Sequence, residues 1–207
     1  MAIASAQQKS IYSVPKAFDF RSPSLEIIQG NLAAVRKHSI LDLGQPLGRN
    51  IEFFSHVSCT LYVENLFESL IDLPPPQEGE GEHPYENRVA RALSHAPDTR
   101  FDVIFGWDLF NYMHGDLINS LMKRLSGSCR SGTLFFLMIS NTLAIPDRPA
   151  RMTVSADGRV SYEPVSGGER QNPRYSPLAL ERMMPGFRLQ HSFLLGTAMQ
   201  DYLFSFG

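Results

Sequence analysis

An acidic residue and two glycines end a short apolar run in the stretch 39–50, SILDLGQPLGRN. Asp42 and Gly44 close a predicted buried strand, and Gly48 lies four residues beyond Gly44. Because glycine has no Cβ, the backbone at these positions can approach a bound ligand closely. A helix that begins near Asn50 would add free N–H groups and the positive end of its dipole. The stretch therefore predicts a nucleotide-type binding site.

Glu64 is a second acidic residue that could contact such a ligand. It ends the predicted strand Thr60–Val63 and follows Asp42 by 22 residues, close to the roughly 20 that separate a nucleotide loop from its ribose-binding acid. At that place a carboxylate accepts hydrogen bonds from ribose hydroxyls. The alternative is that Glu64 caps a predicted helix over Leu66–Leu73, since carboxylates stabilise helix amino termini.

A cluster of polar and aromatic residues follows the predicted buried strand Phe101–Phe105. Ligands bind at this edge of an open α/β sheet, where the strands end. Asp108, Asn111 and Tyr112 are the candidate catalytic residues, because side chains of these types can accept a proton or hold a nucleophile in place.

Structural alternatives exist for each member of this cluster. Asp108 could cap the turn that follows it, and Trp107 and Tyr112 could pack in the core. His114, beside a glycine, is typical of a surface histidine.

Alternating strands and helices must position these residues. The alternation predicts a doubly wound α/β fold with right-handed crossovers and a mostly parallel, Rossmann-like sheet with helices on both faces. A third strand, expected between the second and fourth, is either short or missing. In chain order, the expected helices are Leu25 to about His38, Ile51–His56, Leu66–Leu73, Glu86–Ala96, Asp116–Leu125 and Leu178–Met184, and the expected strands are Ile40–Leu43, Thr60–Val63, Phe101–Phe105, Thr133–Ser140, Phe187–Leu195 and Gln200–Phe206.

Two features depart from this alternation. Met152–Ser155 and Arg159–Tyr162 flank Asp157-Gly158, which predicts a β-hairpin. We expect it at the rim, within an insertion over residues 141–175. The last two strands predict an antiparallel pair that closes the sheet.

The amino-terminal segment Met1–Arg21 is expected to be irregular. Its aromatic residues, Tyr12 and Phe18 among them, could fold over a ligand pocket, or the segment could be a tail that lies on the core. The length of 207 residues suits one sizeable core. We therefore expect a single domain over 1–207, with 1–38 as an amino-terminal segment and helix.

The composition bounds the possible partners. A formal charge of −2 leaves no basic footprint, so neither DNA nor RNA is expected as a direct partner. Cys59 and Cys129 lie far apart and in no Cys/His cluster, which argues against a disulfide framework and a metal site. The longest strongly apolar run, Leu134–Ile139, is far shorter than the roughly 18 residues of a membrane span. Without a signal-like amino terminus, the cytoplasm is the expected compartment.

Taken in order, these motifs resemble the class I S-adenosylmethionine-dependent methyltransferases, whose first motif, D-x-G-x-G-x-G, ends the first strand. The match here is 42–48, D-L-G-Q-P-L-G, in which the acid and the outer glycines are kept and Pro46 replaces the middle glycine. Glu64 matches the acid after the second strand, and Phe101–Tyr112 matches the fourth motif. The closing strand pair matches the reversed last strand of that family. The resemblance covers roughly Leu25–Gly207.

The resemblance implies an S-adenosylmethionine-dependent methyltransferase that acts on an unidentified small molecule. The alternative is a catalytically inactive methyltransferase-like protein that serves in binding or scaffolding; the oligomeric state stays open. The implied catalytic residues are Asp108, Asn111 and Tyr112. The implied cofactor-binding residues are Asp42, Gly44, Gln45, Gly48, Asn50, Glu64, Asn65 and Trp107.

Two further features bear on this site. Proline fixes φ and removes one backbone N–H, so Pro46 either weakens cofactor binding or presets the loop in a compatible turn. Four arginines, at positions 148, 151, 170 and 174, either form the rim of the acceptor pocket, favouring a carboxylate or phosphate group, or are simply solvated.

Overall fold

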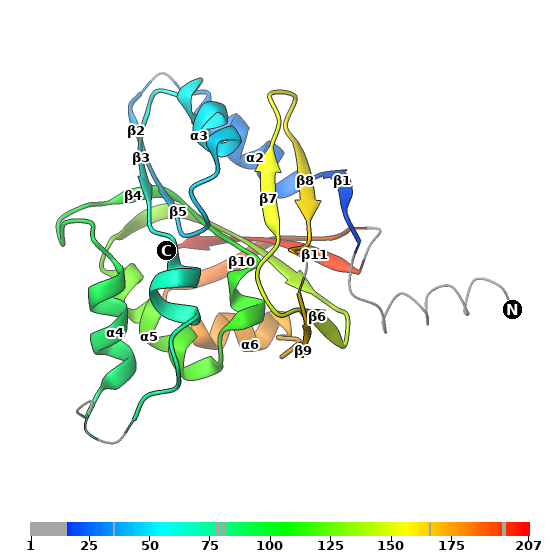
Figure 1. Ribbon diagram of the computed structural model, residues 1–207. Coiled ribbons are helices and arrows are strands. Elements are labelled where there is room, and N and C mark those ends of the chain that lie inside the picture. Colours follow the sequence, from blue (N-terminus) through cyan, green and yellow to red (C-terminus); the bar gives the residue numbers. More distant parts are fainter. Residues whose placement is uncertain (1–15, 35, 78, 80–81, 166, 196–197) are drawn as a thin grey trace, which may run out of the picture.

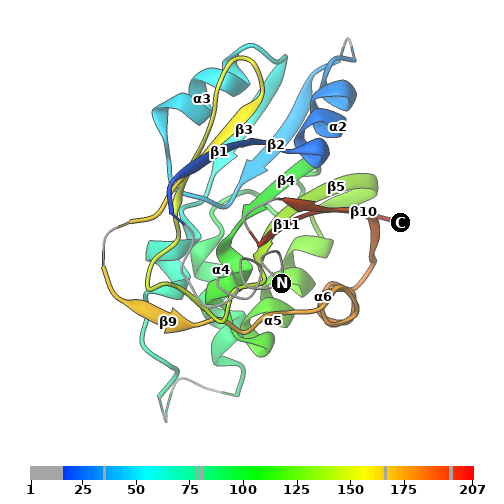
Figure 2. The same ribbon diagram turned by 90° about the vertical axis from the view of Figure 1, so that its right-hand side faces the viewer.

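The structure, a computed structural model, describes residues 16–34, 36–77, 79, 82–165, 167–195 and 198–207. These residues build a six-stranded central sheet with a layer of other elements on each face (Figures 1 and 2). Its strand order is β10-β11-β5-β4-β2-β3. The strands are β2 (His38–Asp42), β3 (Cys59–Val63), β4 (Phe101–Trp107), β5 (Cys129–Ser140), β10 (Phe187–Leu195) and β11 (Met199–Phe206).

The strand directions confirm the predicted fold class. Strand β2 is parallel to both β3 and β4, and β4 is parallel to β5. Strand β11 is antiparallel to both of its neighbours, β5 and β10. The molecule is therefore an α/β protein with a mostly parallel sheet and a reversed last strand.

The third strand of a doubly wound sheet does not occur in the described part of the chain. Between β3 and β4 lie η1 (Phe67–Ile71), a short π-helix, and α4 (Pro84–Ala92), so β3 forms the edge of the sheet. The predicted α-helix over Leu66–Leu73 is wrong in type, because the N–H of Asp72 reaches the carbonyl of Phe67, five residues back, at 2.8 Å.

Helices cover one face of the sheet, below it in Figure 1. Besides α4 and η1, this layer contains α5 (Gly115–Ser126) and α6 (Pro177–Met183). Alternate strand residues point toward it, and Leu41, Ile104 and Phe135 join its hydrophobic core.

The opposite face carries α2 (Pro23–Leu32), α3 (Gly48–Ser55) and a three-stranded sheet of order β1-β8-β7 (Figure 1). This small sheet contains the predicted hairpin, formed by β7 (Arg151–Val154) and β8 (Arg159–Glu163). The expectation that it lies only at the rim is wrong, because side chains such as Tyr162 pack in the second hydrophobic core together with Phe136.

The chain before α2 is more regular than expected. Residues Phe18–Arg21 form β1, which pairs antiparallel with β8, and the ring of Phe18 stacks on Tyr162 at 5.1 Å between centroids. The edge of the hairpin offers unpaired backbone groups, and β1 satisfies them. Tyr12, the other aromatic residue considered for a pocket, lies outside the described residues.

Helix α2 ends at Leu32 and does not continue to His38. The backbone at His38 is already extended, and its N–H donates to the carbonyl of Ser58 beside β3. At the other end of α2, Asp201 on β11 is fully buried and accepts a hydrogen bond from the Ser22 hydroxyl at 2.6 Å. This contact fixes the start of the helix to the sheet.

After β5 the chain crosses the sheet end through β6 (Ala144–Pro146), which pairs with β9 (Glu169–Gln171). The side-chain amide of Asn172 donates to the carbonyls of Ser140 and Thr142, both at 2.8 Å. The segment between β5 and α6 is therefore tied to the carboxyl end of β5, directly above the candidate site.

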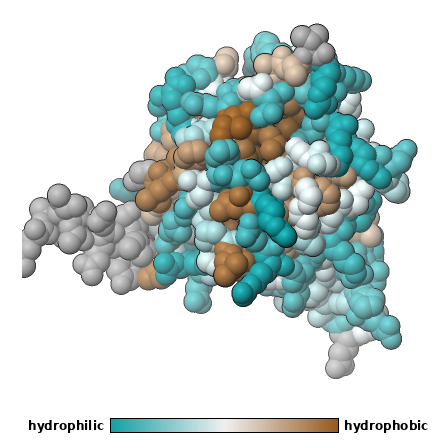
Figure 3. All heavy atoms as spheres, turned by 180° about the vertical axis from the view of Figure 1, so that it is seen from behind, coloured by the Kyte–Doolittle hydropathy of each residue, from teal (hydrophilic) through white to brown (hydrophobic). Residues whose placement is uncertain are grey.

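The surface is mixed in character. Seen from behind, brown hydrophobic side chains are interspersed with teal hydrophilic ones (Figure 3). No helix in the part of the chain that the structure describes is long and apolar enough to span a membrane.

Candidate functional site

Asp42 is the buried centre of the site, at the carboxyl end of β2. One carboxylate oxygen, Oδ1, accepts hydrogen bonds from the N–H of Gly44 at 2.8 Å and from the indole N–H of Trp107 at 2.7 Å. Burial raises the pKa of Asp42 to about 6, although the two hydrogen bonds act in the opposite direction. One oxygen of the carboxyl group is thus engaged by two protein donors.

The indole of Trp107 lies directly on Gly44. A Cβ added at Gly44 would be 2.6 Å from the Cδ1 atom of Trp107. The same ring stacks on Phe105 at 5.3 Å and meets Phe136 edge-on at 5.7 Å. The space that the missing Cβ of Gly44 leaves is therefore taken by a side chain of the protein itself.

Trp107 also has an unusual backbone conformation, with φ at +49°. A bulky residue in this left-handed region is strained, and such residues concentrate at functional sites. Trp107 packs in the core, as one alternative expected, and its role in cofactor binding stays a prediction.

The loop after Gly44 is a tight turn. The N–H of Leu47 donates to the carbonyl of Gln45 at 2.8 Å, which closes a three-residue turn around Pro46. Helix α3 begins at the next residue, Gly48. Proline thus fits the observed turn, which supports the expectation that the loop is preset.

Asn50 contacts the hairpin and not the open end of the helix. Its side-chain amide donates to the carbonyl of Met152 at 2.9 Å, and its oxygen accepts from the N–H of Val154 at 2.9 Å. This pair of bonds fastens β7 to α3. The role of Asn50 in cofactor binding stays a prediction.

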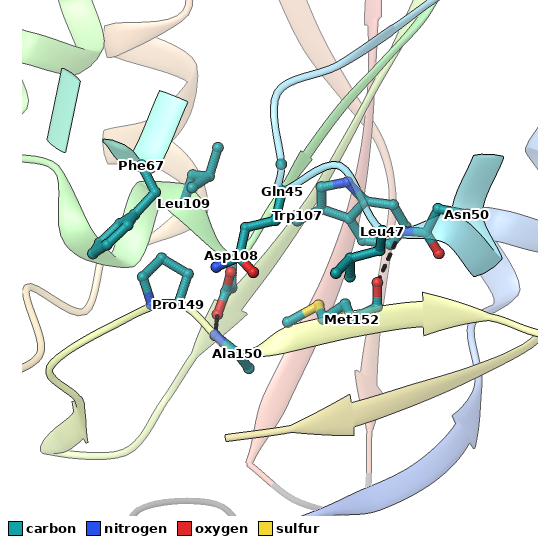
Figure 4. A pocket seen from close by; sticks show the side chains of 11 residues that line it. Gln45, Leu47, Asn50, Phe67, Trp107, Asp108, Leu109, Pro149, Ala150 and Met152 are labelled. Atoms are coloured by element: carbon teal, nitrogen blue, oxygen red, sulfur yellow. Dashed lines mark hydrogen bonds between the residues drawn. The ribbon is translucent and has the colours of Figure 1, made fainter. Parts of the chain in front are cut away.

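A segment over residues 147–150, called the strap from here on, crosses the carboxyl ends of β2 and β4 (Figure 4). The N–H of Ala150 donates to Oδ2 of Asp108 at 3.1 Å, and the hydroxyl of Tyr112 donates to the carbonyl of Arg148 at 2.9 Å. Both Ala150 and Met152 are buried. Two of the three candidate catalytic side chains therefore hold the strap in place.

The environment of Asp108 sets its proton affinity. The side chain is 3% exposed, and burial raises its pKa to about 7 despite the hydrogen bond from Ala150. It makes no side-chain cap on the following turn, so the capping alternative fails. Burial, with Asp108 nearby, also raises the pKa of Tyr112, which stays protonated at neutral pH.

Asn111 and His114 differ in their surroundings. The amide of Asn111 donates to the carbonyls of Asp108 and Met138, at 2.8 and 3.0 Å, and joins the end of β4 to that of β5. His114 is exposed, caps α5 and meets the ring of Tyr85 edge-on at 4.6 Å between ring centroids. The surface interpretation of His114 is therefore the one that the geometry supports.

Between the strap and Gly44 lies a small space, the inner cavity, of about 20 Å³. This is enough for about one water molecule, whereas pockets for small molecules span roughly 300–1,000 Å³. Its walls come from the loop after β2, the end of β4, η1 and the strap (Figure 4). They are Gly44, Gln45, Leu47, Asn50, Phe67, Trp107, Asp108, Leu109, Pro149, Ala150 and Met152.

A larger depression of about 500 Å³, the outer groove, adjoins the inner cavity on its surface side. Gln45, Leu47 and Phe67 line both spaces. Asn65 lines the outer groove, and its side-chain oxygen is buried without a hydrogen-bond partner among the described residues. The groove is therefore large enough for a nucleoside-sized ligand, and one of its lining residues has a buried acceptor that lacks a donor among the described residues.

Glu64 is engaged on the helical side of the sheet. Its carboxylate accepts hydrogen bonds from the N–H groups of Ser94 and His95, at 2.9 and 3.1 Å, and from the Ser94 hydroxyl. It is 7% exposed. These bonds stabilise the loop after α4 and do not cap η1. Binding of ribose by Glu64 stays a prediction that requires exchange of these partners.

The arginines divide between different places. Arg148 and Arg151 line the outer groove, and the Arg148 guanidinium lies 5.9 Å from the ring centroid of Phe67. Arg170 lies over Tyr112 at 5.7 Å, in a separate cleft of about 250 Å³. Arg174 lines neither space. Two of the four arginines therefore line the outer groove, and their role at the rim of an acceptor pocket stays a prediction.

Sequence reasoning missed the strap and the aromatic wall formed by Phe67. The strap had one available signal, the two prolines at 146 and 149, because the residue before a proline favours extended backbone. Nothing local indicated that this extended piece would lie across the ends of β2 and β4.

The structure, but not the sequence, is similar to known proteins. The sequence matches no family model and no curated protein. The structure is similar to that of 1,6-didemethyltoxoflavin-N1-methyltransferase from Burkholderia thailandensis, solved with 1,6-didemethyltoxoflavin and S-adenosylhomocysteine bound. The identity is 16%, the match covers 89% of this chain and 76% of that chain, and the TM-score is 0.51.

Two further structural matches have TM-scores below 0.5. A TehB-like S-adenosylmethionine-dependent methyltransferase from Corynebacterium glutamicum is 13% identical, with 89% and 87% of the chains covered and a TM-score of 0.47. The glycopeptide N-methyltransferase MtfA, complexed with sinefungin, is 13% identical, with 92% and 100% covered and a TM-score of 0.49. On the strength of the first match, the chain has the fold of the class I S-adenosylmethionine-dependent methyltransferases, as the motifs predict.

The two outer glycines of the first motif should respond differently to the same substitution. Gly44→Ala should lower the free energy of unfolding by about 1–3 kcal/mol, because the new Cβ overlaps the Trp107 ring. Gly48→Ala, the matched control, meets nothing within 4 Å in the first turn of α3 and should be neutral or slightly stabilising. Urea denaturation of both variants measures the difference. Equal stability would show that Trp107 moves away without cost.

Proposed function

We propose that this chain is an S-adenosylmethionine-dependent methyltransferase that acts on a small molecule. The observation that carries the proposal is the junction of β2 and β4 in a methyltransferase fold. There Gly44 and Asp108 line the inner cavity, and Asn65, whose side-chain oxygen is unpartnered among the described residues, lines the neighbouring outer groove. The similar Burkholderia enzyme is one that binds a small-molecule substrate and S-adenosylhomocysteine.

The two spaces differ in how well they suit the cofactor. The outer groove has the size for its nucleoside part, and Asn65 offers a buried acceptor there. The inner cavity has no room for the remainder while Trp107 and the strap keep these positions. Residues Gln45, Leu47 and Asn65 would hold the cofactor on the outer side, and the N–H groups at the start of α3 would lie near Gly48.

S-adenosylmethionine, when bound, supplies a methyl group that is already activated for transfer. The residues of this chain then need only hold the acceptor, exclude water and take up a proton. Asp108 suits the last task, because its Oδ2, which accepts a hydrogen bond from the N–H of Ala150, can accept a proton once that bond is broken. With the strap in place, burial raises the pKa of Asp108 to about 7, so the carboxyl is partly ionised at neutral pH. Tyr112 stays protonated, so its hydroxyl can donate or accept a hydrogen bond but does not serve as the base.

A second function is favoured by a specific observation. Two groups that would contact the cofactor contact the protein itself. Gly44 is covered by the indole of Trp107, and the carboxylate of Glu64 accepts a hydrogen bond from the N–H of Ser94. A methyltransferase-like protein that binds without catalysis would have this arrangement. Detection of methyl transfer to any acceptor would exclude it.

Titration calorimetry with S-adenosylmethionine and S-adenosylhomocysteine tests the first proposal. We expect binding of both ligands below millimolar concentration. Asn65→Ala should weaken it roughly twofold to tenfold, the worth of one hydrogen bond. Asn31→Ala, on the exposed side of α2, is the matched control and should leave the affinity unchanged. If neither ligand binds the wild-type chain at millimolar concentration, the proposal is wrong.

A further inference from the structure

Resting on the proposed function, we propose that the strap is an autoinhibitory gate over the inner half of the cofactor site. In the closed state described here the chain can accept a nucleoside in the outer groove, but not the whole cofactor. Binding of the whole cofactor requires the strap to leave Tyr112 and Asp108, and the Trp107 ring to leave Gly44.

The walls of the inner cavity leave almost no free space inside it. Its lid is made by Pro149 and Ala150 of the strap, and its floor by Trp107 and Gly44 (Figure 4). The remaining space of about 20 Å³ admits nothing larger than a water molecule. Because the Trp107 ring lies on Gly44 and the strap covers the same space, both must move before a ligand reaches Gly44.

The strap is the wall that can move at low cost. Residues Asp147 and Arg148 of the strap are exposed, and the two buried residues that follow, Pro149 and Ala150, have small side chains. Little apolar surface is exposed when they leave, so opening of the strap is less costly than the movement of the Trp107 ring. Asn50 meanwhile keeps Met152 and the rest of β7 in place.

Two hydrogen bonds hold the strap closed. Between β6 and β7 it is fastened by the hydroxyl of Tyr112 on the carbonyl of Arg148, and by Asp108 on the N–H of Ala150. Both anchoring side chains come from the segment that follows β4, which is where the acceptor would lie. The same groups thus serve the closed gate and become available when it opens.

Short and long ligands should depend differently on the strap. The outer groove lies outside the strap and is open in the same state in which the inner cavity is closed. A ligand that needs only the groove should be insensitive to the strap. A ligand that also needs the inner half pays the cost of opening, and its apparent dissociation constant is divided by the fraction of open molecules.

Tyr112→Phe tests the gate, because it removes one anchoring hydrogen bond and keeps the ring that packs edge-on against Phe67. Loss of one bond should raise the open fraction, and hence the affinity for S-adenosylhomocysteine, about fivefold. The affinity for adenosine should stay unchanged. Tyr175→Phe is the matched control: its hydroxyl donates to the carbonyl of Met113 at 2.8 Å, away from the strap, and neither affinity should change.

Trp107 provides a second, optical readout, since it is the only tryptophan in the chain. S-adenosylhomocysteine should shift its fluorescence emission as the ring leaves Asp42, and adenosine should not. Pro149→Gly supplies an independent variant: it gives the open strap more conformational freedom and should tighten S-adenosylhomocysteine binding in the same direction.

The outcomes separate the gate from the function. If S-adenosylhomocysteine binds wild type and both strap variants equally, or if adenosine binding tightens by the same factor, the gate is overturned while the proposed function stands. If no protein binds S-adenosylmethionine or S-adenosylhomocysteine, the proposed function is overturned and the gate with it. Selective tightening of the longer ligand supports both.

Discussion

Trp107→Ala is expected to bind S-adenosylhomocysteine at least tenfold more tightly than wild type, although the folded protein becomes less stable. The substitution removes the ring that lies on Gly44 and joins its volume to the inner cavity. Loss of a buried aromatic side chain should lower the free energy of unfolding by about 3–5 kcal/mol. Calorimetry and urea denaturation on the same preparation measure the two effects.

Phe136→Ala is the matched control for this prediction. Phe136 is equally buried and meets Trp107 edge-on, but it does not line the inner cavity. It should lose stability by a similar amount without any gain in affinity. If both variants bind S-adenosylhomocysteine alike, the ring of Trp107 is not what closes the site.

The second large effect is on the pH dependence of stability. The pKa values of Asp108 and Asp42 are raised by burial from 3.8 to about 7 and about 6. At a pH between 3.8 and the raised pKa, each carboxyl group is protonated in the folded chain and ionised in the unfolded chain. Their contribution to stability is therefore complete below about pH 4 and is lost as the pH rises toward 7.

Asp108→Asn isolates the larger part of this effect. The amide keeps an oxygen that can accept from the N–H of Ala150 but has no proton to lose. A rise in pKa from 3.8 to about 7 corresponds to at most about 4 kcal/mol. Relative to wild type, the variant should therefore gain stability steadily from pH 4 to pH 7, as measured by urea denaturation at each pH.

Asp157→Asn controls for removal of a carboxylate as such. Asp157 is exposed, and the hydroxyl of Ser155 lowers its pKa, so its own titration lies below the range concerned. The slope of stability between pH 4 and pH 7 should match wild type. A slope that is also unchanged in Asp108→Asn would mean that Asp108 is ionised in the folded protein throughout this range.

Local signals in the sequence predict most of the fold. The apolar run before Asp42, the glycine at 44 and the Asp157-Gly158 turn each determine the conformation of a few neighbouring residues, and the structure shows the expected elements there. Periodicity likewise locates α5, since its buried positions recur every three or four residues. These features depend on residues close in sequence.

The contacts that fill the candidate site depend on residues far apart. Asn50 meets the hairpin across 102 positions, Asp108 meets the strap across 42, and Glu64 meets Ser94 across 30. No local pattern specifies which distant backbone group a polar side chain will reach. The sequence therefore indicates which residues gather at the sheet end, but not that they are engaged with one another.

A crystal structure of the full chain with S-adenosylhomocysteine at saturating concentration tests the central claim most directly. The proposal predicts ligand in the outer groove beside Asn65 and in the enlarged inner cavity, with the strap released from Tyr112 and the Trp107 ring withdrawn from Gly44. A structure that keeps the Trp107 to Asp42 hydrogen bond, with no ligand beside Gly44, would contradict it.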